Sequence, residues 1–147
     1  METEIATPFH IQALLQLAGL AQIILALSSL AIPKMLNWRV ELNKTTTLIR
    51  QMFWTYAAYI WVINVCFGLL SVFCYTDLAS GSVLAILMNG FIATYWISRV
   101  LIQFFYFDRA AFPTGKLYLF GEGLLVLVFI ILSIVYAYAF VYNAFLS

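Results

Sequence analysis

Apolar residues gather into four long runs along this chain, and short polar or charged stretches separate them. The runs cover residues 9–32, 52–75, 82–107 and 117–146. A helix of about 20 apolar residues spans a hydrocarbon core of roughly 30 Å, and each run reaches that length. The pattern predicts an all-α integral membrane protein. We expect a single transmembrane domain over residues 1–147, folded as a four-helix transmembrane bundle with up-down topology.

Composition agrees with a membrane protein and excludes a soluble globular one. Hydrophobic residues make up 65% of the chain and charged residues only 9%, whereas soluble domains carry about 25% charge. Four crossings and their loops use nearly the whole length, so no separate soluble domain is expected. Membrane lipid is an expected partner, and nucleic acid is not, because the net charge is only +1.

Positive charge is concentrated in two connections between the apolar runs. The basic residues there are Lys34, Arg39, Lys44, Arg50, Arg109 and Lys116, six of the seven Lys and Arg residues. Lys and Arg near membrane ends are retained on the cytoplasmic side. We therefore expect loops 33–51 and 108–116 to be cytoplasmic. Glu2, Glu4, Asp77 and both termini then lie on the extracytoplasmic side of a plasma or inner membrane.

Polar and small residues share one face of each predicted helix when the helices are projected at about 100° per residue. The amides near this face in the first three helices are Gln12, Gln16, Gln22, Asn64 and Asn89. Lipid offers no hydrogen bonds, so amides at these depths need protein or water partners. Interhelical packing is the favoured explanation of this polar stripe. A hydrated cavity, or a binding site for an amphiphile lined by the same residues, is the alternative.

Two charged residues, Arg99 and Glu122, lie inside predicted helices. A charge at a helix centre costs about 2.5 to 3.5 kcal/mol on insertion scales, so each needs compensation. A rise of about 1.5 Å per residue places the two at similar depths in adjacent helices. We expect an intramembrane ion pair, with Gln103 as an added partner. The alternative is that Arg99 extends to lipid headgroups while Glu122 sits at the interface beside Lys116.

Basic and aromatic residues cluster at the predicted inner boundary of the second and third helices. The candidates for the rim of an anion-binding or ligand-binding site are Arg50, Arg99, Gln103, Tyr106 and Arg109. Lipid anchoring is the simpler explanation, because anionic headgroups attract a juxtamembrane basic residue by about 1 kcal/mol. The single histidine, His10, lies apart from any cluster of acids or cysteines, so the sequence predicts no metal site and no cofactor.

In length and four-helix layout the chain resembles the membrane-associated glutathione transferases and related enzymes. Arg99, followed by Tyr106 seven residues later, is similar to the third-helix arrangement of that family. The resemblance implies binding of a thiol compound. However, the acidic signature of the family's second helix is missing between Arg50 and Asn64, and no family is assigned.

Three classes of function remain. A noncatalytic accessory or structural subunit of a larger membrane complex is favoured, because the chain has no soluble domain and no convincing catalytic set. Its partners would be other membrane subunits or further copies of itself. The second class is a small membrane enzyme or binding protein for a lipophilic ligand such as a lipid, a quinone or a glutathione conjugate. The third is a transporter or channel subunit, for which four helices would need to oligomerise.

Overall fold

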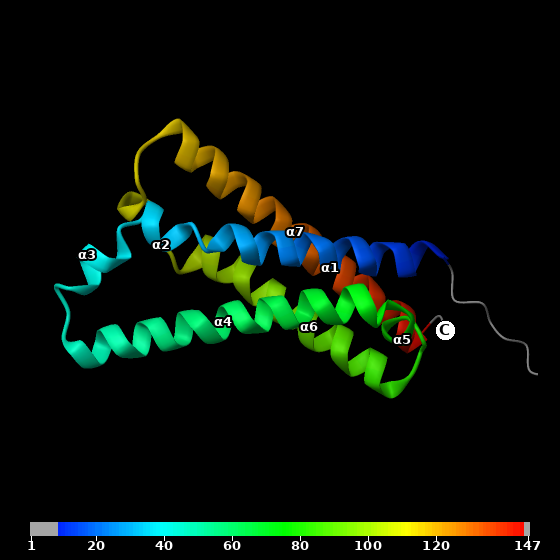
Figure 1. Ribbon diagram of the computed structural model, residues 1–147. Coiled ribbons are helices and arrows are strands. Elements are labelled where there is room, and N and C mark those ends of the chain that lie inside the picture. The colour runs from blue at the N-terminus through cyan, green and yellow to red at the C-terminus, as the bar shows by residue number, and fades with distance from the viewer. Residues whose placement is uncertain (1–8, 146–147) are drawn as a thin grey trace, which may run out of the picture.

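The computed structural model of this chain describes residues 9–145, which fold entirely into helices and connections without strands (Figure 1). The long helices are α1 (Phe9–Ser29), α4 (Thr47–Phe73), α6 (Val83–Phe105) and α7 (Lys116–Phe145). The short ones are α2 (Ile32–Met35), α3 (Trp38–Leu42), α5 (Tyr75–Leu78) and the 3-10 helix η1 (Arg109–Ala111). Glu2, Glu4 and residue 146, for which the sequence made predictions, lie outside the described residues.

Four segments of the described chain are long and apolar enough to cross a membrane. They are Phe9–Met35, Thr47–Phe73, Val83–Phe105 and Lys116–Phe145, where the first joins α1 and α2. The expectation of an all-helical chain with four membrane-spanning segments is therefore confirmed by length and composition.

The helix ends depart from the apolar runs because local backbone chemistry sets them. α1 ends at Ser29, four residues before Pro33. A proline has no N–H to donate to the carbonyl four residues earlier, and its ring clashes with that carbonyl. Pro33 instead lies in the first turn of α2, a position that tolerates proline. α4 begins at Thr47, five residues before the predicted start, because Thr46 caps it by accepting a 3.4 Å hydrogen bond from the backbone N–H of Ile49.

The long helices form two antiparallel hairpins, α1 with α4 and α6 with α7. Small residues allow the first pair to come close: a Cβ added at Gly19 would lie only 2.9 Å from the carbonyl oxygen of Gly68. The second hairpin crosses the first obliquely, and the two meet along α1 and α7 (Figure 1).

The hydrophobic core cluster lies in one half of the bundle. All buried residues of α4 lie from Asn64 onward, and those of α7 lie from Phe129 onward. Segments 47–63 and 116–128 therefore contain no fully buried side chain. The helices diverge toward the end that holds connections 30–46 and 106–115 (Figure 1). We call this end the basic end, and we call the opposite half, which contains α5, the packed half.

Candidate functional site

Four side chains at the centre of the packed half form one hydrogen-bonded group, with one member from each long helix. This central network consists of Gln22, Ser71, Trp96 and Tyr136, and each residue is 0% exposed. The amide nitrogen of Gln22 donates to the hydroxyl of Tyr136, and the indole N–H of Trp96 donates to the Gln22 carbonyl oxygen at 3.1 Å. The hydroxyls of Ser71 and Tyr136 share a further hydrogen bond. The central network thus links all four long helices and satisfies polar atoms that lipid could not.

Two asparagines hold the α5 connection against the bundle. The side-chain amides of Asn89 and Asn143 donate to the carbonyl oxygen of Leu78 at 2.8 and 2.9 Å. Asn143 also accepts a 2.7 Å hydrogen bond from the backbone N–H of Gly81, which has a positive φ of 72°. These bonds fix the connection between α4 and α6. Gly81 has a left-handed backbone conformation there, which glycine adopts at no steric cost.

The amides of the predicted polar stripe occupy different surroundings. Gln22, Asn64 and Asn89 are buried, whereas Gln12 and Gln16 on α1 are only half-buried. The side-chain oxygens of Asn64 and Asn89 are both buried without a hydrogen-bond partner among residues 9–145, but Asn89 bonds through its amide nitrogen to the carbonyl oxygens of Leu78 and Ala85. A buried acceptor without a partner is unusual in a folded protein and calls for a specific explanation.

Arg99 and Glu122 are not brought into direct contact. The amide nitrogen of Gln103 donates to a carboxylate oxygen of Glu122 at 3.0 Å, and the one ion pair within residues 9–145 joins Lys44 and Glu41. The guanidinium carbon of Arg99 lies instead 5.9 Å from the ring centre of Tyr95. Side chains on a helix point toward its N-terminus, so Arg99 extends toward the packed half. Gln103 lies one turn nearer the basic end than Arg99. It is therefore Gln103, and not Arg99 as predicted, that bonds to Glu122.

The remaining residues of the predicted anion rim, Arg50, Tyr106 and Arg109, have separate surroundings. Arg50 donates to the side-chain oxygen of Asn43 at 2.9 Å. The guanidinium of Arg109 lies 5.8 Å from the ring centre of Phe104, and Tyr106 is 81% exposed. None of these contacts joins two of the arginines, so within the described chain they do not form one binding rim.

Sequence reasoning did not single out Tyr95, although a signal for it was present. Tyr95 lies four residues before Arg99, and residues with this spacing are neighbours on a helix surface. An aromatic ring at that spacing can hold a guanidinium over its face. The spacing could therefore have identified an aromatic partner for Arg99 beside the predicted acidic one.

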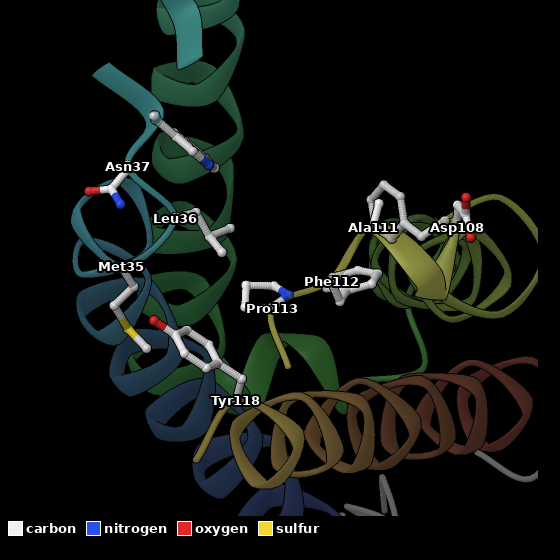
Figure 2. A pocket seen from close by; sticks show the side chains of 10 residues that line it. Met35, Leu36, Asn37, Asp108, Ala111, Phe112, Pro113 and Tyr118 are labelled. Atoms are coloured by element: carbon white, nitrogen blue, oxygen red, sulfur yellow. The ribbon is translucent and has the colours of Figure 1, made fainter. Parts of the chain in front are cut away.

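An open pocket of about 530 Å³ lies at the basic end, between the α2–α3 turn and the connection that joins α6 to α7 (Figure 2). Leu36, Pro113 and Tyr118 point toward its centre, and Trp38 and Phe112 also line it. A second pocket of about 440 Å³ is lined by Lys34, Arg39 and Trp54, among others. Basic and aromatic residues are typical of a membrane–water interface. The sequence did not predict these pockets, because two separate connections line the first, and one connection together with Trp54 of α4 lines the second.

Comparisons with known proteins give no relative from which a role could be transferred. No family model, curated protein or solved structure matches this chain.

Proposed function

We propose that this chain is a noncatalytic structural or accessory subunit of a membrane protein complex, formed with other membrane subunits or with further copies of itself. The central network and the two asparagines at α5 support this proposal. Their polar groups bond to one another and to the backbone across helices. Such bonds stabilise helix association in a membrane, so these polar residues have a structural role.

The observation that carries the proposal is the exposed half of α4. Segment 47–63 contains no fully buried residue, and Tyr56 and Tyr59 are 59% and 64% exposed. Tyr59 is near the middle of α4, roughly 18 Å along the helix from Thr47. A tyrosine hydroxyl at that depth needs a hydrogen-bond partner that hydrocarbon cannot supply. A helix of a neighbouring subunit packed against α4 would supply one.

We also propose an orientation in which the basic end is cytoplasmic. The basis is the retention of Lys and Arg on the cytoplasmic side, since both basic connections lie at the same end of the bundle. The membrane would be a plasma or inner membrane. The environment of Arg99 favours a second candidate function, the binding of a lipophilic anion.

The proposed subunit role predicts a protein contact on α4. A photo-crosslinking amino acid in place of Tyr59 is expected to form a protein adduct of one defined mass in native membranes. The matched control is Leu17 on α1, which is 63% exposed and should give only lipid adducts. Both products would be resolved by mass spectrometry after affinity purification.

The same preparation supplies the contradicting result. If both positions yield only lipid adducts, and the chain purified in a mild detergent has the 16.7 kDa mass of one copy, the subunit role is wrong. A stoichiometric complex that depends on the α4 surface would support it. Copies of this chain and a different subunit are distinguished by the adduct mass.

A further inference from the structure

We propose that Arg99, Tyr95 and Asn64 form a binding site inside the membrane for an oxyanion carried on an apolar chain. The ligand class is a lipid-like molecule with a carboxylate or a phosphate group. This inference rests on the second candidate function, the binding of a lipophilic anion, and is independent of the proposed subunit role, because its evidence is a set of unpartnered polar groups on α4 and α6. We call these three residues the Arg99 cluster.

The position of the Arg99 guanidinium is the first support. Its carbon lies 5.9 Å from the ring centre of Tyr95 and 5.8 Å from that of Phe129, which is buried. The Arg99 Cα lies about 9 Å inside the end of α6 at Phe105. The two rings hold the charge toward the packed half, so it does not extend to the headgroups at the basic end.

No carboxylate of the described chain compensates this charge. Glu122 accepts its hydrogen bond from Gln103, and Glu41 pairs with Lys44. Asp108 caps η1 by accepting from the backbone N–H of Ala110 at 2.9 Å. The remaining acid among residues 9–145 is Asp77, which lies in α5 at the opposite end of the bundle. An intramembrane arginine normally pairs with an acid or a carbonyl oxygen, so a ligand anion would complete its surroundings.

Asn64 and Tyr95 also carry buried polar atoms that lack partners, and the remaining such atom among residues 9–145, the side-chain oxygen of Asn89, belongs to the residue that bonds to α5. The Asn64 side-chain oxygen, the Tyr95 hydroxyl and the Arg99 Nε are all buried and make no hydrogen bond within residues 9–145. Asn64 is only 7% exposed. Unpartnered buried polar atoms are rare, and a cluster of them marks a place where a missing group would bind.

Helix geometry brings the members of the Arg99 cluster to the same depth. The rings of Phe67 on α4 and Tyr95 on α6 are in contact, with centroids 5.3 Å apart. Asn64 lies about one turn before Phe67, and Arg99 lies about one turn after Tyr95. Because α4 and α6 run in opposite directions, both steps lead toward the basic end (Figure 1). Asn64 and Arg99 therefore lie at similar depth on the basic side of the ring contact.

The chemistry of the Arg99 cluster fits an amphiphilic oxyanion. A guanidinium binds carboxylate and phosphate through paired N–H donors. The Tyr95 hydroxyl can donate to the same anion, and the Asn64 amide can bond an adjacent ester or hydroxyl group. Toward the basic end the helices diverge, and Ile60 and Ile102 are each 39% exposed, which offers an apolar surface for an acyl chain.

Native mass spectrometry of the full chain in a neutral detergent tests this proposal. The ligands are phosphatidylglycerol, oleate and, as the uncharged comparison without an oxyanion, dioleoylglycerol. We expect one tightly bound equivalent of an anionic ligand, and we expect Arg99→Gln to weaken its binding at least about tenfold, as loss of a charged hydrogen bond does. Saturable binding of phosphatidylglycerol alone identifies phosphate as the anion, and binding of oleate alone identifies carboxylate. Binding of both supports the shared chemistry.

Matched variants keep the test decisive. Arg109→Gln removes an exposed arginine at the basic end and should leave the affinity within about twofold, because surface charges contribute little. If Arg99→Gln fails to fold, Tyr95→Phe removes only a hydroxyl and should weaken binding a few-fold. Equal binding by the Arg99→Gln and Arg109→Gln variants would overturn the proposal. Absence of a one-to-one complex with either anionic ligand would overturn it as well.

Discussion

Replacement of Gly19 with leucine is expected to force α1 away from α4 and to lower the free energy of unfolding by about 3 kcal/mol, the upper range for overpacking a tight interface. A Cβ at Gly19 would lie 2.9 Å from the carbonyl oxygen of Gly68 and 2.9 Å from the Cβ of Ser71. Neither atom can move without a shift of the α4 backbone. Titration with sodium dodecyl sulfate from mild-detergent micelles, followed by circular dichroism, measures this change.

Gly121 provides the matched control for Gly19→Leu. It also lies in a long helix, but a Cβ there would meet no atom within 4 Å. Because both substitutions replace glycine in a helix, the difference in helix propensity cancels between them. Gly121→Leu should therefore leave the free energy of unfolding unchanged or slightly raised. Equal destabilisation by the two variants would show that the close α1–α4 approach does not stabilise this bundle.

Replacement of Gln22 with leucine is expected to have the second largest effect. The variant removes the hydrogen bonds of Gln22 with Tyr136 and Trp96, so the buried indole N–H of Trp96 loses its acceptor and the Tyr136 hydroxyl oxygen loses a donor. Interhelical hydrogen bonds in membranes contribute about 0.6 kcal/mol on average and up to about 1.7, so loss of two should lower the free energy of unfolding by about 2 kcal/mol. The same detergent titration measures the loss.

Two control substitutions separate the central network from general effects of polar residues. Gln16→Leu changes a half-buried amide of the same helix and should cost less than about 0.5 kcal/mol, as most surface substitutions do. Tyr136→Phe should destabilise the bundle, whereas Tyr138→Phe, at a 39% exposed position, should not. If Gln22→Leu and Gln16→Leu unfold alike, the central network contributes nothing to stability.

The sequence predicted the four membrane-spanning segments because hydrophobic length alone sets them. Hydrophobic length did not place their ends, which depend on Thr46 and Pro33. The early start of α4 follows from a single capping side chain in a polar segment, and apolar runs contain no such signal. A capping residue followed by good helix formers would have extended the prediction to Thr47.

The polar residues were predictable as a set but not as specific pairs. Helical periodicity assigned Gln22, Asn64 and Asn89 to inward faces, and all three are buried. The bonds of the central network depend on the relative heights of four helices, which one sequence does not encode in any local pattern. The same limitation applies to Arg99, whose predicted depth matched that of Glu122 but whose guanidinium lies by the rings of Tyr95 and Phe129.

The uneven distribution of the core was also beyond sequence reasoning. All four apolar runs look uniform, yet the buried residues of α4 and α7 lie only from Asn64 and Phe129 onward. In a membrane, a side chain that faces lipid and one that faces another helix can have the same hydrophobicity. The divergence of the helices toward the basic end therefore became visible only in three dimensions.

The central claim is that four helices cross the membrane and bring both basic connections to one surface. Single cysteines at positions 44, 116 and 77, in a chain whose free Cys66 and Cys74 are replaced with alanine, can be labelled with an impermeant maleimide in sealed vesicles of known orientation. We predict that Lys44→Cys and Lys116→Cys react only from the cytoplasmic side, and Asp77→Cys only from the other. Labelling of positions 44 and 116 from opposite sides would contradict the account.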